Sequence, residues 1–252
     1  MKIISFINQK GGSGKTTTTL NVGACLANKG YKVILVDIDP QSNLTTSAGV
    51  QISDGDPTIY EVLKGDADIN AAIVSGVKPY DIIPTDIRQS GADIELAGVA
   101  GRDFLLKEAL QALKPAYDYV LIDCPPALSI ITLMALTASD GVIIPVQAQY
   151  LALNGVSQLL DTINLVKRRL NPDLDIIGTV VTMYDPRKTL DREVLENVKR
   201  AFPEKVFATT ISNNVALAEA PAAGSDIFAY SPKAKGAGQY EALTTEILER
   251  SI

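Results

Sequence analysis

The chain has 252 residues, 46% of them hydrophobic, a formal net charge of −6, two cysteines and no histidine. This hydrophobic content supports a sizeable core and excludes disorder over the whole chain. The absence of histidine excludes Ser-His-Asp and Cys-His catalysis and most zinc sites. Cys25 and Cys124 lie too far apart in the chain to predict a metal site or a disulfide framework.

Charge and hydropathy also limit the kinds of partner and the cellular compartment that we expect. An acidic chain binds nucleic acid only through a local basic patch. No apolar run reaches the roughly 18 residues of a membrane span. The segment MKIISFINQKGG lacks the apolar region and the cleavage site of a signal peptide. We therefore expect a cytoplasmic protein.

Apolar segments alternate with helical patterns along the chain. The first strand is predicted at residues 2–8, and a helix over residues 14–30 ends at a glycine. Further strands are predicted at residues 32–39, 80–84, 117–123, 140–146, 174–184 and 205–211, and further helices at residues 103–113, 153–170, 190–201 and 238–250.

This alternation predicts an α/β fold. Strands that are apolar throughout are buried on both sides, so we expect a mostly parallel twisted sheet with helices on both faces. No long linker, repeat or low-complexity segment divides the chain, and one domain is expected over residues 1–252. Because the first strand begins at residue 2 or 3, no N-terminal DNA-binding module is expected.

The segment INQKGGSGKTTTT, residues 7–19, places a glycine-rich turn between a predicted strand and a predicted helix. This is the context of a phosphate-binding loop, where glycines admit a phosphate and a helix N-terminus adds its positive end. Lys15 would reach the β- and γ-phosphates, and the Thr16 hydroxyl would bind Mg²⁺. The usual pattern has Gly where this chain has Gln9, and a second lysine, Lys10, follows. An incidental glycine-rich turn is the alternative.

Two other predicted strands end in carboxylates. Asp37 and Asp39 lie in VDIDPQSN, at the strand end where open parallel sheets bind ligands. A plain Asp-Pro turn is the alternative. Asp123 ends the apolar run in YVLIDCPP, a Walker B pattern for holding Mg²⁺, with a simple strand cap as the alternative. Cys124 is interpreted as a packing residue.

The segment VVTMYD ends a late strand and bears on the nucleotide base. Many P-loop GTPases carry N/T-K-x-D at this place. Thr182 and Asp185 fit that pattern, but Met183 replaces the lysine. Guanine is therefore disfavoured, and ATP is the expected nucleotide.

The segments KGGSGKTT, DIDPQSN, DCPP, VIIPVQAQYLALNGV, VTMYDPR and EAPAAG resemble the ParA/MinD family of deviant Walker ATPases, and within it the short chromosomal-type ParA (Soj) proteins. The resemblance covers nearly the whole chain. It implies a single P-loop NTPase domain that hydrolyses ATP with Mg²⁺. It also implies that Lys10 marks the deviant Walker A motif and crosses to the phosphates of a second subunit in an ATP-bound homodimer.

The resemblance further implies roles for individual residues. Gly12 would lie at the close dimer contact, Asp39 would position the attacking water, and Asp123 would anchor the metal. The implied catalytic residues are Lys10, Gly12, Lys15 and Asp39, and the implied metal-binding residues are Thr16, Asp39 and Asp123. The nucleotide would contact Lys10, Gly11, Gly12, Ser13, Gly14, Lys15, Thr16, Thr17, Met183, Asp185, Ile211 and Asn213.

The same resemblance implies a nucleoid-associated protein that binds DNA without sequence preference and is released when a ParB-type partner stimulates hydrolysis. Chromosomal-type relatives carry arginines where this chain has Asn213 and Ala216. Residues 167–205 still hold nine Lys/Arg against seven Asp/Glu, so DNA binding is expected and expected to be weak. The basic candidates are Lys167, Arg168, Arg169, Arg187, Lys188, Arg192, Lys199 and Arg200. A solvated helix end is the alternative interpretation of the KRR run.

The alternative function is a MinD-like or other positioning ATPase that does not bind DNA. A membrane-targeting helix is basic on its polar face, whereas GQYEALTTEILERSI carries Glu241, Glu246 and Glu249 against Arg250, so no membrane partner is expected. An iron protein of the nitrogenase-reductase type needs two cysteines around a shared cluster, and Cys25 falls in the P-loop helix. A scaffold with an inactive ATP site is disfavoured because the P-loop and the strand-end carboxylates are intact.

Overall fold

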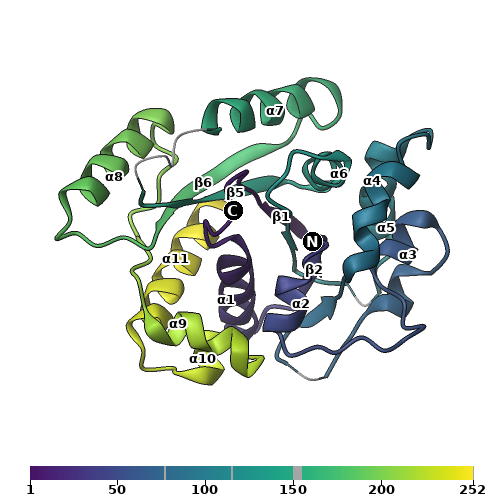
Figure 1. Cartoon of the computed structure of the whole chain (residues 1–252), viewed down its shortest axis with the longest axis horizontal. Helices are drawn as coiled ribbons and strands as arrows, with labels where there is room; N and C mark the ends of the chain where they lie inside the picture. Colours follow the sequence, from purple (N-terminus) through teal and green to yellow (C-terminus); the bar gives the residue numbers. More distant parts are fainter. Residues whose placement is uncertain (77, 115, 150–154, 252) are drawn as a thin grey trace.

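A parallel sheet forms the centre of the molecule (Figure 1). The computed structural model describes residues 1–76, 78–114, 116–149 and 155–251, and in these residues the sheet has six strands in the order β3-β2-β4-β1-β5-β6. All neighbouring strands are parallel. The strands are β1 (Lys2–Phe6), β2 (Val33–Asp37), β3 (Asp81–Ile83), β4 (Tyr119–Asp123), β5 (Gly141–Gln147) and β6 (Asp175–Thr182).

Helices connect these strands and cover the sheet. They are α1 (Lys15–Asn28), α2 (Asn43–Ser47), α3 (Ile59–Lys64), α4 (Ala92–Glu95), α5 (Leu105–Gln111), α6 (Ile130–Ala138), α7 (Val156–Arg169), α8 (Thr189–Ala201), α9 (Val215–Glu219), α10 (Ile227–Tyr230) and α11 (Lys235–Ser251). The helix predicted over residues 153–170 is found as α7, and its first two positions lie outside the described residues. No helix in the described ranges is both long and apolar enough to cross a membrane.

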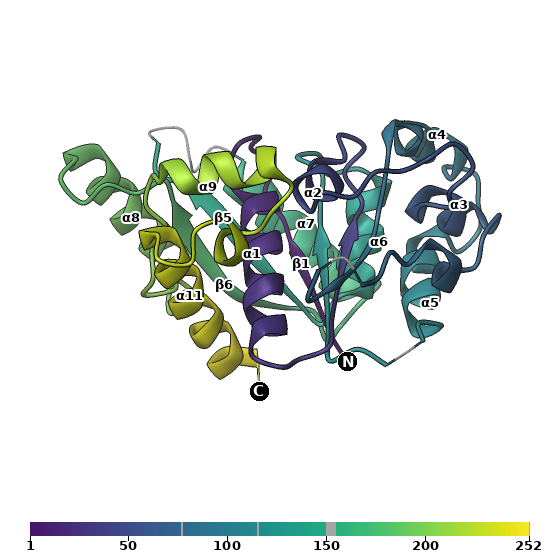
Figure 2. The same ribbon diagram turned by 90° about the horizontal axis from the view of Figure 1, so that it is seen from below.

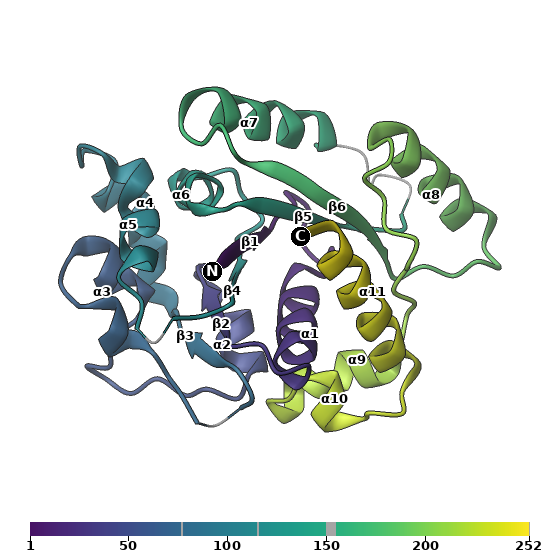
Figure 3. The same cartoon turned by 180° about the vertical axis from the view of Figure 1, so that it is seen from behind.

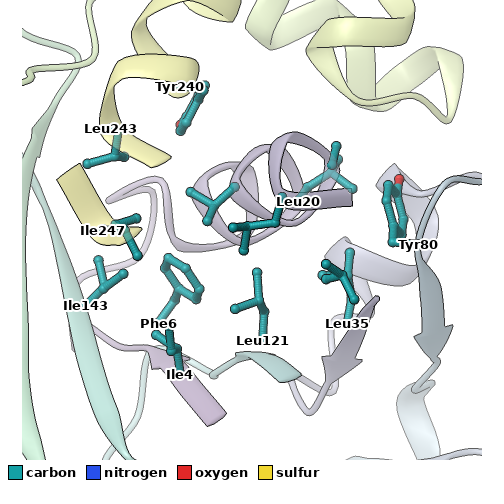
Figure 4. Packing of buried hydrophobic residues seen from close by; sticks show 14 of the residues in the cluster. Ile4, Phe6, Leu20, Leu35, Tyr80, Leu121, Ile143, Tyr240, Leu243 and Ile247 are labelled. Atoms are coloured by element: carbon teal, nitrogen blue, oxygen red, sulfur yellow. The ribbon is translucent and has the colours of Figure 1, made fainter. Parts of the chain in front are cut away.

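The sheet packs against helices on both faces, because successive side chains of a strand point to opposite sides. Phe6, Leu35 and Leu121 lie in one core with residues of α1 and α11, and Figure 4 shows this packing. Val36 and Ile122 face the other side, where they pack with residues of α3, α5 and α6. The helices α7 and α8 cover the β5 and β6 end of that second face (Figure 3). The predicted single α/β domain is therefore confirmed.

The carboxyl ends of the parallel strands share one edge of the sheet, and the segments that carry the sequence motifs lie at this edge. The P-loop follows β1, the VDIDPQSN segment follows β2, and the DCPP turn follows β4. Figure 2 shows α2 at this edge. In the strand register Asp123 lies beside both Phe6 of β1 and Asp37 of β2. The strand order therefore brings three distant segments together.

The strand predicted over residues 205–211 is wrong. In the described structure this segment makes an isolated parallel bridge at Val206 and forms no named strand. The backbone N–H groups of Ala208 and Thr209 donate instead to the Glu246 carboxylate of α11. Phe207 and Ile211 still donate backbone hydrogen bonds to β6, so the Glu246 side chain interrupts the pairing in the middle of the segment and no regular strand forms.

Gly49, just after α2, makes a close backbone contact with the C-terminal half of the chain. It has φ of 75°, and a Cβ there would lie 2.8 Å from the carbonyl oxygen of Gly224. Gly55 also has positive φ, 93°, but no atom lies within 4 Å of its Cβ position. We expect Gly49→Ala to lower the free energy of unfolding by about 2–4 kcal/mol and Gly55→Ala by about 1 kcal/mol. Urea denaturation measures both, and equal losses would contradict the close backbone contact.

Candidate nucleotide site

The P-loop runs from the end of β1 into the first turn of α1. Gly12 and Gly14 have φ of 71° and 87°, values that glycine adopts without strain. On the β6 side, the Thr182 hydroxyl donates a hydrogen bond of 2.8 Å to the carbonyl oxygen of Ser13. The Asn8 side chain accepts the backbone N–H of Lys10 at 2.9 Å. Side chains on both sides of the loop therefore hold its shape.

Lys15 and Thr16 begin α1 and point toward the Walker B strand. Lys15 is buried, with 6% of its surface exposed. Burial lowers the pKa of its ammonium, and the nearby Asp123 carboxylate opposes that change. The Thr16 hydroxyl donates a hydrogen bond of 2.6 Å to Asp123 Oδ2. The structure thus brings the predicted phosphate-binding and metal-binding residues into contact.

Three carboxyl groups gather at this edge of the sheet: Asp39 and Asp123 lie near Lys15, and Asp37 lies beside Asp123. Asp37 and Asp123 are fully buried and Asp39 is 5% exposed. Burial raises the pKa of the Asp37 carboxyl to about 7. Burial, together with the charge of Asp37, also raises the pKa of Asp123 well above its ordinary value. The cluster therefore holds more acidic than basic groups, and a bound cation would stabilise their charged forms.

The donor atoms of the cluster fit Mg²⁺. Asp123 Oδ1 is buried and has no hydrogen-bond partner among the described residues, so it is available to a hard cation. Carboxylate and hydroxyl oxygens, here from Asp123 and Thr16, are ligands that Mg²⁺ accepts. The described ranges contain no group of three or more His, Cys, Asp or Glu side chains arranged to hold a metal ion. Phosphate and water oxygens would have to complete the shell, as is usual for Mg²⁺.

Two adjoining hollows open at this edge of the sheet. The first has a volume of about 340 Å³ and is lined by residues 11–17 of the P-loop together with Asp39, Pro126 and residues of α2. The second, of about 160 Å³, is lined by apolar and amide side chains that include Ile211, Asn213, Leu217 and Tyr240. Gly14, Thr17 and Met183 line both hollows. These shared residues join the hollow at the P-loop to the second hollow.

Met183 stands where the two hollows meet. Its φ is 55°, a conformation that is uncommon for a residue with a side chain. The Gln147 amide donates to its sulfur at 3.0 Å. Such strain persists only where the surrounding structure over-determines it, so the backbone of Met183 is held in place where the two hollows meet.

Two predicted nucleotide contacts lie outside the linings of both hollows. Lys10 is half-buried, and its Nζ donates to Gln149 Oε1 at 2.9 Å. Asp185 accepts hydrogen bonds of 2.9 and 2.8 Å from the guanidinium of Arg187, and these bonds lower the pKa of its carboxyl. The structure therefore separates Lys10 and Asp185 from the space that Lys15 and Met183 line.

Several lining residues were missed from the sequence. They are Gln41, Asn43, Ser47, Pro126, Thr182, Ser212, Asn214, Leu217, Ala218 and Tyr240. The segment VDIDPQSN drew attention to its aspartates, but α2 has five residues, too few to show a helical period. Tyr240 comes from a helix whose apolar pattern indicates only that it packs against the core.

The predicted basic residues lie on α7, on α8 and on the segment before α8. Lys167, Arg168 and Arg169 occupy the last turn of α7, and the others are Arg187, Lys188, Arg192, Lys199 and Arg200. All are exposed, and α7 and α8 lie over the same face of the sheet (Figure 3). Lys199 pairs with Glu196 at 2.8 Å, and Arg187 pairs with Asp185. Exposed pairs of this kind contribute little to stability, but they reduce the positive charge of the surface.

Comparisons with known proteins agree with this geometry. Residues 1–176 match the family model described as an AAA domain. The sporulation initiation inhibitor protein Soj of Bacillus subtilis (strain 168) is 49% identical over 98% of this chain and 98% of its own length. The chromosome partitioning protein ParA of Caulobacter vibrioides (strain NA1000 / CB15N) is 42% identical over 99% of this chain and 95% of its own length.

Solved structures show the same fold. Cobyrinic acid a,c-diamide synthase from Mycobacterium smegmatis, with bound ATP analog and magnesium, has a TM-score of 0.87 and 37% identity over 100% of this chain and 96% of its own. A plasmid partition protein from Borrelia burgdorferi B31 bound to AMPPNP has a TM-score of 0.84 and 29% identity over 100% and 99% of the two chains. From these matches over nearly the whole length, and from the P-loop geometry described above, the chain belongs to the ParA/Soj family of P-loop ATPases.

Proposed function

We propose that the chain is a partition ATPase that forms a homodimer when it binds ATP and separates after hydrolysis. The observation that carries the proposal is the contrast between the two lysines of the P-loop. Lys15 is buried and lines the phosphate hollow. Lys10 is half-buried, bonds to Gln149 and lines neither hollow. This contrast supports the proposal that the Lys10 ammonium serves a second subunit, as expected for a deviant Walker A lysine.

The two hollows take ATP with Mg²⁺ in this proposal. Similar solved structures support it, one with a bound ATP analog and magnesium and one with bound AMPPNP. Lys15 and the loop N–H groups hold the phosphates, and Thr16 and Asp123 hold the metal, which neutralises charge on the phosphates when bound. The second hollow has apolar walls from Ile211 and Leu217, and none of the described residues that line it is charged, which suits adenine better than guanine.

Hydrolysis needs an oriented water more than a strong base, because positioning and electrostatics carry most of phosphoryl transfer. Asp39 is the carboxylate that lines the phosphate hollow, and we assign it the orientation of that water. Intrinsic hydrolysis is then slow, and a ParB-type partner accelerates it. ATP stabilises the dimer because it binds that state preferentially, and hydrolysis removes the preference.

The dimer binds DNA without sequence preference through the exposed basic residues of α7 and α8, and works as a cytoplasmic, nucleoid-associated protein. The local excess of Lys/Arg in residues 167–205 supports this part of the proposal. Asn213 and Ala216, together with the Arg187–Asp185 pair, indicate that the binding is weak. If these features abolish DNA binding altogether, the protein is a nucleotide-switched positioning ATPase that uses another surface.

The test is binding of a fluorescent non-specific DNA duplex with ATP, with ADP and without nucleotide, across a salt series. The proposal expects binding that needs ATP and falls steeply as salt rises. No binding at low salt, in a sample where light scattering shows the ATP dimer, would remove DNA from the function and favour the positioning switch.

Lys10→Ala should abolish the ATP-dependent dimer while ATP still binds to the monomer, because Lys15 holds the phosphates within the subunit. Size-exclusion chromatography with light scattering measures the dimer, and a fluorescent ATP analogue measures the affinity. Lys29→Ala is the matched control, since Lys29 is exposed and ends α1 away from the P-loop. Dimers that persist in Lys10→Ala would disprove the role of Lys10 in the partner site.

Asp39→Ala should trap the ATP dimer, because ATP binds but water is no longer oriented. We expect phosphate release to fall about 100-fold or more, as when a positioning group is lost. Asp54→Ala, which removes an exposed carboxylate elsewhere, should leave hydrolysis unchanged. Hydrolysis by Asp39→Ala at the wild-type rate would refute the role assigned to Asp39.

Arg187→Glu should weaken DNA binding and lower the slope of log affinity against log salt by about one, the effect of losing one phosphate contact. Lys233→Glu makes the same charge change at an exposed position outside the basic set and should leave the slope unaltered. If the two variants give the same slope, Arg187 does not belong to the DNA-binding surface.

A further inference from the structure

Asp39 lines the phosphate hollow, whereas Asp37, like Asp123, lines neither hollow. Asp37 is fully buried at the carboxyl end of β2, directly beside Asp123 in the strand register. A buried carboxylate is costly to remove from water unless hydrogen bonds compensate it. Its partners therefore show what the chain gains from placing it there.

The hydrogen bonds of Asp37 go to the segment that follows β2. Asp37 Oδ1 accepts the backbone N–H of Asp39 at 3.1 Å. Asp37 Oδ2 accepts both the backbone N–H and the hydroxyl of Thr45, each at 2.8 Å. The Thr45 oxygen in turn accepts the backbone N–H of Thr85 at 3.1 Å, just beyond β3. One carboxylate and one hydroxyl thus connect the ends of β2 and β3 to α2.

These bonds hold both ends of the segment that lines the phosphate hollow opposite the P-loop. Asp39, Gln41, Asn43 and Ser47 contribute to that lining. The helix α2 has five residues and no side-chain bond at its N-cap, so it has little stability of its own. Leu44 packs in the core and anchors one side of α2, and the bonds that Asp37 accepts tie Thr45 of α2 and the backbone of Asp39 to the end of β2.

The P-loop is held by different contacts. Ser13 is bonded by Thr182 of β6, and Lys10 is bonded by Asn8. Lys15 and Thr16 belong to α1, which packs in the core on the other side. Loss of the Asp37 contacts should therefore leave the phosphate-binding loop in place.

We propose that Asp37 and Thr45 form a positioning pair that sets the Asp39 carboxylate for hydrolysis and is not needed to bind ATP. The inference rests on the proposed function, because it assumes that Asp39 orients the attacking water. Neither Asp37 nor Thr45 touches the nucleotide space, so both act through Asp39 and α2.

The main test is the steady-state kinetics of Thr45→Val. This change keeps the shape of the side chain but removes its bond to Asp37 and its acceptor for Thr85. We expect kcat to fall about 10- to 100-fold, the cost of a small misplacement of a catalytic group, while the Kd for ATP stays within about threefold.

Thr45→Ser keeps the hydroxyl and should restore kcat to within about twofold. Thr46→Val makes the same change at the exposed neighbour and should behave as wild type.

The ATP-bound dimer provides a second readout. If Thr45→Val misplaces Asp39 alone, the dimer should accumulate in ATP and persist longer than in wild type. A role in stability alone would instead reduce ATP affinity and the dimer together, and would overturn the inference. Asp37→Asn, which has the same shape but cannot accept at both atoms, extends the test if Thr45→Val fails to fold.

Two further outcomes distinguish the inference from the function beneath it. If the wild-type protein hydrolyses ATP and kcat is unchanged in both Thr45→Val and Asp37→Asn, the positioning pair alone is overturned. The same holds if Thr45→Ser is as slow as Thr45→Val. Wild-type protein that neither dimerises nor hydrolyses ATP would overturn the proposed function, and the positioning pair with it.

Discussion

Burial of charge at the carboxyl edge of the sheet is the constraint on which the site depends. Lys15, Asp37 and Asp123 are almost completely removed from water, and an unpaired charge in that position would be strongly destabilising. The fold stabilises them through one another, through the Thr16 and Thr45 hydroxyls and through a cation that would bind beside Asp123. A scaffold without a ligand would gain nothing from this arrangement, whereas a nucleotide with Mg²⁺ supplies the missing charges.

In the proposed function, the residues that hold ATP and the residue that orients water lie in different segments of this edge. The P-loop is bonded to β6, and α1 packs in the core. The segment after β2 is held by buried side-chain bonds and by the core packing of a helix of five residues. A change in one set of contacts can therefore alter hydrolysis without removing the contacts of the phosphate loop.

The outer surface gives weaker structural support for its proposed role than the nucleotide site does. The basic residues of α7 and α8 share one face, yet Asp185, Glu196 and Asp175 pair with some of them. Exposed pairs of this kind are weak, and DNA phosphates can compete with the carboxylates. In the proposed function, this competition would weaken DNA binding and favour release.

The sequence by itself determined the order of elements and the identity of the phosphate loop. Strands that are apolar on both faces need helices on both sides, and the β1 to α1 segment has the glycines that a phosphate loop needs. Short elements such as α2 and α4 could not be predicted, because four or five residues show no period. The strand prediction at residues 205–211 was wrong because the β-rich composition of the segment says nothing of the Glu246 side chain that interrupts its pairing with β6.

Only the tertiary structure decided which residues meet. The sequence pairs Asp37 with Asp39 as neighbours, but the strand order places Asp37 beside Asp123 and turns it toward Thr45. The sequence pattern suggests Asp185 as a contact to the nucleotide base, but after β6 this carboxylate accepts hydrogen bonds from Arg187. It shows two lysines on one loop, and the fold buries one and leaves the other bonded to Gln149. Each outcome depends on contacts between residues far apart in the chain, which local composition and periodicity do not encode.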